Sequence, residues 1–110
     1  MQIDLGGKTR RIEYGIGAIR AMEREAGGIG LHRLLSEERM GVDTVCLLVW
    51  AGLRHENKKL SAEQVDSWLE DYLDKGGTLE ALMIIVLEAL KKVKWLKIGD
   101  VGNAEAGAAE

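Results

Sequence analysis

The chain has 110 residues, 46% of them apolar and 30% charged, a composition typical of one soluble globular domain. The net charge is −3, but all 15 Lys and Arg and 15 of the 18 Asp and Glu precede residue 99, so residues 1–98 are formally neutral. A neutral domain lacks the basic surface that nucleic-acid binding requires, and no apolar run approaches the roughly 20 residues of a membrane span, so we expect neither partner.

Residue types that are rare or missing are also informative. The chain contains no proline and is rich in Leu, Ala, Glu and Lys, which favours long helices. The single cysteine, Cys46, excludes an intramolecular disulfide and fits a reducing compartment. The N-terminal segment lacks the basic-then-apolar order of a signal peptide, so we expect a cytosolic protein.

The N-terminal segment predicts a β-hairpin. Ile3 and Leu5 alternate with polar neighbours, as do Ile12 and Tyr14, so each strand has one face to cover. The Gly6-Gly7 pair supplies the positive φ angles of a tight turn. An isolated hairpin is marginal in water, so we expect it to lie against the rest of the domain.

Three helices are predicted next. The first covers residues 16–26 and ends at the Gly27-Gly28 pair, and a short second helix covers residues 31–38. The third helix, residues 42–53, is apolar on nearly every side. Such a helix is buried either at the centre of a fold or in an oligomer.

Two more helices have clear start and stop signals. Ser61 followed by Gln64 is a capping-box sequence, and the Gly76-Gly77 pair ends this fourth helix. Thr78 is the expected N-cap of the fifth helix, residues 79–96. The fold class is therefore mainly α, with a small N-terminal β-hairpin followed by about five helices packed as a compact helical domain.

Two features lie outside this core pattern. In the fifth helix, Ile84 and Ile85 fall outside the stripe of core residues. Large apolar residues on a second helix face need a partner, either within the fold or from another chain. Residues 99–110 are small, polar and acidic, and we expect them to form a disordered tail after a single domain of residues 1–98.

The densest polar cluster follows the third helix, at Arg54, His55 and Glu56. If the helix continued, Cys46 and His55 would be nine residues and about half a turn apart, so they would not form a nucleophile–base pair. Basic residues near a helix C-terminus interact favourably with its dipole. We interpret the cluster as a helix end, with contact to a partner as the functional alternative.

Other chemical candidates are weak. The two histidines and one cysteine have no metal-binding spacing, and Gly15 and Gly17 are like a phosphate loop only superficially, because Arg20 occupies the place of the third glycine. We expect no catalytic residue, metal, cofactor or small-molecule substrate. Arg20 and Arg24, one turn apart, form either a solvated mixed-charge face or a contact for an acidic partner.

The order of these elements resembles the tail assembly chaperones of long-tailed bacteriophages and prophages, and related gene-transfer-agent proteins. The resemblance covers residues 1–96 and rests on three segments, YGIGAIRAMEREAG, WAGLRHEN and LSAEQVDSWLEDYL. It implies a non-enzymatic protein of the host bacterial cytoplasm that is absent from the mature virion. Its implied partners are the tape measure protein, which it keeps soluble, and the tail tube protein, which it helps to recruit.

The residues themselves also favour a binding module. A small neutral helical domain with surplus apolar helix surface suits the binding of amphipathic helices. We expect self-association as well, because many copies could then coat one long client. The tentative partner-binding residues are Arg20, Arg24, Arg54, His55, Glu56, Ile84 and Ile85.

Three alternatives remain open at this point. The first is a structural minor tail or connector component of the virion. The second is a small transcription regulator with a helix-turn-helix, which the neutral charge disfavours. The third is an enzyme, for which no reactive constellation is visible in the sequence.

Overall fold

The fold begins with two short strands, which five helices follow. The computed structural model describes residues 2–36 and 41–96. Its elements are β1 (Gln2–Leu5), β2 (Lys8–Arg11), α1 (Ile16–Glu25), α2 (Leu31–Leu34), α3 (Val42–Leu53), α4 (Ala62–Asp74) and α5 (Leu79–Lys91). The predicted mainly α class, with an N-terminal hairpin and five helices, is confirmed. The expected acidic tail, residues 99–110, and the expected boundary at residue 98 lie outside the described residues.

The hairpin forms as predicted but its second strand is shorter than expected. β1 and β2 pair antiparallel, with Leu5 opposite Lys8, and the turn between them has φ angles of 60° at Gly6 and 83° at Gly7. The prediction extended the second strand to Tyr14, whereas β2 ends at Arg11. Beyond that residue the chain directs its hydrogen bonds to α3.

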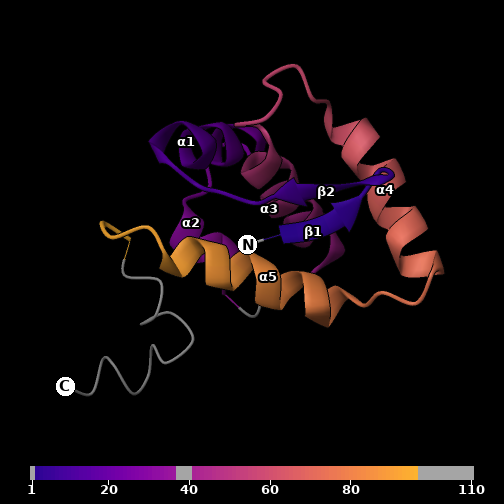
Figure 1. The fold of residues 1–110 in the computed structure, drawn as a ribbon. Coiled ribbons are helices and arrows are strands. Elements are labelled where there is room, and N and C mark those ends of the chain that lie inside the picture. Colours follow the sequence, from indigo (N-terminus) through magenta and orange to yellow (C-terminus); the bar gives the residue numbers. More distant parts are fainter. Residues whose placement is uncertain (1, 37–40, 97–110) are drawn as a thin grey trace.

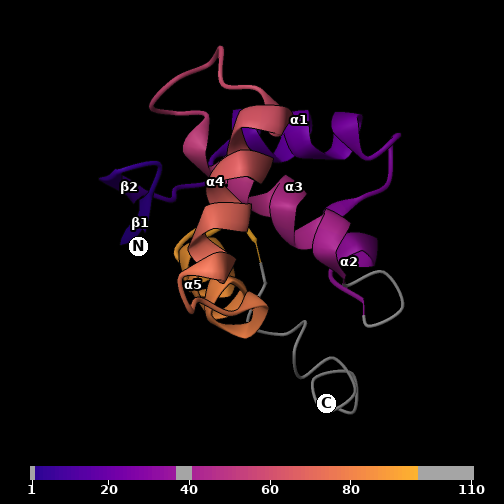
Figure 2. The same cartoon turned by 90° about the vertical axis from the view of Figure 1, so that its right-hand side faces the viewer.

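Helix α3 is the centre of the fold. It contacts α1, α4, α5 and β2, and Figures 1 and 2 show these elements around it. Eight of its residues are buried, namely Thr44, Val45, Leu48, Val49, Trp50, Ala51, Gly52 and Leu53. The prediction of a helix buried at the centre of the fold is confirmed. Its N-terminal turn is the exception, because Val42 is 56% exposed.

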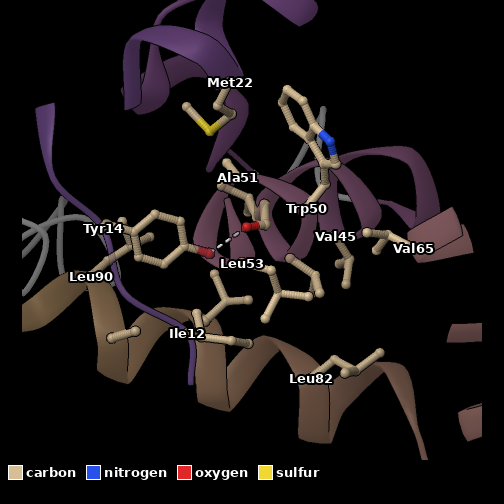
Figure 3. Packing of buried hydrophobic residues seen from close by; sticks show 14 of the residues in the cluster. Ile12, Tyr14, Met22, Val45, Trp50, Ala51, Leu53, Val65, Leu82 and Leu90 are labelled. Atoms are coloured by element: carbon tan, nitrogen blue, oxygen red, sulfur yellow. Dashed lines mark hydrogen bonds between the residues drawn. The ribbon is translucent and has the colours of Figure 1, made fainter. Parts of the chain in front are cut away.

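The core around α3 contains side chains from α1, α4 and α5. Leu48 and Val49 are fully buried, and Met22 of α1, Val65 of α4 and Leu82 of α5 are equally inaccessible to solvent. Figure 3 shows Met22 above α3 and Leu82 below it, on α5. Complete burial of one such side chain stabilises the fold by about 1.5–3 kcal/mol.

The predicted glycine stop signals end their helices through the same backbone geometry. In α4, the N–H of Gly76 donates to the carbonyl of Leu73 at 3.2 Å, and that of Gly77 donates to Tyr72 at 3.0 Å. Gly76 has a φ of 103°, which glycine adopts readily. The Gly27-Gly28 pair ends α1 with the same two hydrogen bonds.

The predicted N-caps of α4 and α5 are also present. Ser61 Oγ accepts a hydrogen bond from the N–H of Gln64 at 3.1 Å, and Thr78 Oγ1 accepts one from Ala81 at 3.0 Å. These bonds satisfy amide groups that have no partner inside the helix. Local sequence signals therefore define where both helices begin.

The predicted ends of two helices need correction. α5 ends at Lys91 and not at residue 96, because the following N–H groups of Lys92 and Val93 bond to carbonyls three residues back, which tightens the last turn. This turn carries Val93 into the core. α2 ends at Leu34, before the expected residue 38, and residues 37–40 lie outside the described residues.

Candidate functional site

The C-terminal end of α3 is joined to the chain that follows β2. α3 ends at Leu53 with Arg54 as its C-cap, so the predicted helix end is confirmed. The N–H of Glu13 donates to the carbonyl of Gly52 at 2.9 Å. One residue further, the hydroxyl of Tyr14 donates to the carbonyl of Leu48 at 2.5 Å, the dashed bond in Figure 3.

His55 and Glu56 complete this junction. The imidazole Nε2 of His55 donates to the carbonyl oxygen of Arg11 at 2.8 Å, and the N–H of Arg11 donates to the Glu56 carboxylate at 3.2 Å. Both outward-facing peptide groups of Arg11 are thereby satisfied by side chains. An unpaired strand edge invites association with other strands, and these two residues cover the edge of β2 at this point.

Glu13 adds an ion pair to the same junction. The guanidinium of Arg11 hydrogen-bonds the Glu13 carboxylate, and this bond lowers the pKa of that carboxyl. Nδ1 of His55 lies 3.8 Å from the other Glu13 oxygen. His55 therefore holds the hairpin through the hydrogen bond of its Nε2 atom. It lines a different groove from Cys46, which lies toward the opposite end of α3.

Arg54 lies beside a different feature, an open groove of about 490 Å³. Its guanidinium is 5.2 Å from the centre of the Trp50 ring, and its Nε atom is buried without a hydrogen-bond partner. His55 and Lys58 line the same groove, together with Gly15 and Gly17 at the start of α1. The fold thus brings Arg54 and His55 together with the glycine-containing turn.

Arg20 and Arg24 lie elsewhere, exposed on α1. The carboxylate of the neighbouring Glu23 accepts a hydrogen bond from the N–H of Leu31 at 2.8 Å and so caps α2. The sequence gives no sign of this cap, which spans eight residues. The two arginines remain a solvated face in this structure.

Ile84 and Ile85 have different environments, although the sequence places both outside the core stripe. Ile85 is partly buried and packs against the core, so its partner lies within the fold. Ile84 is 62% exposed. Ile84 is the more exposed of the two and offers the larger apolar contact to another molecule.

A second groove, which no sequence pattern predicted, lies at the N-terminal end of α3. It has a volume of about 550 Å³, and Cys46 and Leu47 lie in its lining beside Asp43 and Asp66. Burial raises the pKa of the Cys46 thiol, and the Asp66 and Asp43 carboxylates raise it further. The groove joins residues from distant parts of the chain, and the only local signal is the one-turn spacing of Asp43, Cys46 and Leu47.

The raised pKa of Cys46 predicts that its thiol reacts slowly with disulfide reagents. Near neutral pH, Cys46 is expected to react with a disulfide reagent more slowly than an unstructured cysteine peptide does, because only the thiolate reacts and less of it is present. The rate should rise with pH and should match that of the peptide after unfolding in urea. Since the chain has one cysteine, the reaction reports this site alone. A rate equal to that of the peptide in the folded protein would contradict the prediction.

Within residues 2–36 and 41–96, no group of three or more His, Cys, Asp or Glu is placed to hold a metal ion. None of the helices described is long and apolar enough to cross a membrane. Comparisons with family models, curated proteins and solved structures found no match.

Proposed function

We propose that the chain is a phage or prophage tail assembly chaperone, a non-catalytic protein that binds the tape measure protein and helps to recruit the tail tube protein. The three segments that carry the resemblance coincide with α1, the C-terminal end of α3 and α4. They therefore belong to the elements that build the domain. Self-association and a location in the host cytoplasm are parts of the same proposal.

The observation that carries the proposal is Ile84, an exposed apolar side chain on α5. Ile84 is 62% exposed on a helix whose other face is firmly packed in the core. Exposing an isoleucine on a rigid helix gains nothing for folding, whereas it offers a contact to an amphipathic client helix. A chaperone for a long helical protein needs such contacts.

The polar cluster has a structural role in the proposed protein. His55 and Glu56 bind backbone groups of Arg11, and their side chains have structural partners that explain their presence. In the proposed protein, these residues hold the hairpin in place, and Ile84 makes the apolar contact with the client. Arg54, whose Nε atom is buried without a hydrogen-bond partner beside an open groove, remains a candidate for a polar contact.

Co-expression with the neighbouring tape measure gene tests the proposal. The fraction of tape measure protein in the soluble extract is expected to rise with the wild-type chain and to fall again with Ile84→Asp. The matched control is Ile16→Asp, because Ile16 is equally exposed, at 65%, but lies at the start of α1. If the wild-type chain leaves the solubility unchanged, the proposed function is wrong.

The same system separates the chaperone from the structural alternative. A chaperone is expected to be absent from purified particles, whereas a minor tail or connector subunit is retained in them. Mass spectrometry of purified virions makes this distinction. Stoichiometric recovery of the chain in the particles would replace the chaperone proposal with a structural role.

A further inference from the structure

The groove at the N-terminal end of α3 has the features of a docking surface. It lies where the first turns of α3 and α4 meet the C-terminal end of α1. Figure 2 shows α3 passing from beside α2, at its N-terminal end, to behind α4. Its volume of about 550 Å³ is within the range of roughly 300–1,000 Å³ found for binding pockets.

The floor of the groove is apolar and incompletely covered. Ala26, Ile29, Cys46 and Leu47 line it, and all four are partly buried against the core. Leu34 of α2 also lines the groove and is buried. Core side chains therefore reach the surface here, where an apolar group of another molecule can cover them.

The rim of the groove is acidic. Glu25 of α1, Asp43 of α3 and Asp66 of α4 are exposed and converge on it from three elements. Among the described residues that line it, none is Lys, Arg or His. Asp66 and Asp43 influence Cys46 at the floor of the groove: burial raises the pKa of its thiol, and the charges of these two carboxylates raise it further.

We propose that this groove binds an amphipathic helix whose apolar stripe is flanked by Lys or Arg. The apolar stripe covers the floor and the cations pair with the three carboxylates, whereas an acidic peptide or a phosphate group is repelled. Asp43 and Leu47 are one turn apart on α3, and Ala62 and Asp66 are one turn apart on α4. This spacing matches the ridges of a third helix laid beside them.

A helix also fits better than an extended segment. A helix satisfies its own backbone hydrogen bonds, and the groove is lined by helix surfaces that offer no strand edge. Small side chains at Ala26, Cys46 and Ala62 allow the backbone of the ligand to approach closely. The inference deepens the proposed function by assigning a surface for a helical client, and it rests on that function only for the identity of the client.

The test uses a synthetic peptide of about 18 residues, long enough to form a helix, with a leucine stripe flanked by lysines. Its binding is measured by fluorescence anisotropy at low salt. We expect binding that weakens as salt is added, and little binding of the same peptide with glutamate in place of lysine. The bound peptide should also protect Cys46 from a thiol reagent, which places it in this groove.

Two matched double variants test whether the rim carboxylates are responsible for binding the lysine peptide. Asp43→Asn with Asp66→Asn is expected to weaken binding about tenfold. Glu80→Gln with Glu88→Gln removes the same net charge from α5, including one acid in a first helical turn, and is expected to leave binding unchanged. Circular dichroism before and after unfolding confirms that both variants are folded.

Three results would overturn the inference: no binding of the lysine peptide, equal binding of the glutamate peptide, or equal effects of the two double variants. The outcome is separate from that of the co-expression test, because the peptide contains no phage sequence. Peptide binding without any effect on the tape measure protein would reject the proposed function and retain the groove. The reverse result would reject the groove alone.

Discussion

Replacing Leu48 with alanine is expected to lower the free energy of unfolding by about 2–5 kcal/mol, the usual cost of truncating a fully buried leucine. Leu48 is 0% exposed and lies in the middle of α3, the helix that α1, α4 and α5 all contact. Little can collapse to fill the cavity, because the surrounding elements are held apart by α3 itself. A single domain has only about 5–15 kcal/mol of stability, so the variant should be marginal.

Urea denaturation followed by circular dichroism measures this change. The matched control is Ile84→Ala, which also truncates an aliphatic side chain on a helix but at a position that is 62% exposed. We expect the control to change stability by no more than about 0.5 kcal/mol. If Leu48→Ala and Ile84→Ala had equal effects, α3 would not be the centre of the fold.

Replacing Gly52 with alanine is expected to destabilise the fold by about 1–3 kcal/mol, through overpacking. A Cβ atom at this position would lie 2.6 Å from Cγ2 of Ile12 and 2.9 Å from the Tyr14 ring. Both neighbours are buried, and Tyr14 is further held by its bond to Leu48. The chain after β2 must therefore move away from α3, although alanine favours a helix more than glycine does by about 1 kcal/mol.

Gly17→Ala provides the control for this effect. Gly17 is also helical, but a Cβ atom there would have no neighbour within 4 Å. With no clash, the better helix propensity of alanine should make this variant neutral or more stable by up to about 1 kcal/mol. Thermal unfolding of the two variants compares them directly, and a stabilised Gly52→Ala protein would show that the contact with Ile12 is looser than described.

Much of the helical structure was predictable because its signals are local. The Gly76-Gly77 pair, Ser61 and Thr78 each determine the conformation of residues within one turn, and each acts in the structure as the sequence indicates. The uniformly apolar α3 was likewise predictable as the central helix. Such features depend on nearest neighbours and on side-chain periodicity, which a sequence displays directly.

The junction between β2 and α3 was not predictable, because its contacts join residues that are distant in the sequence. The hydrogen bond from Glu13 to Gly52 joins residues 39 positions apart, and no local pattern identifies such partners. The same holds for the acidic groove, which combines Glu25, Asp43 and Asp66. Ile84 and Ile85 differ only in how α5 is rotated against the core, which neighbouring helices decide.

The central position of α3 also bears on how the protein acquires its structure during synthesis. A ribosome releases the hairpin and α1 first, yet the residues that hold them, Leu48 to Glu56, emerge only some forty positions later. α3 in turn is covered by α5, the last of the described helices to appear. The hairpin and α1 therefore lack their partners in α3, and α3 lacks its cover from α5, until most of the described chain has left the exit tunnel. Stable folding of this domain therefore requires most of residues 2–96 to have been synthesised.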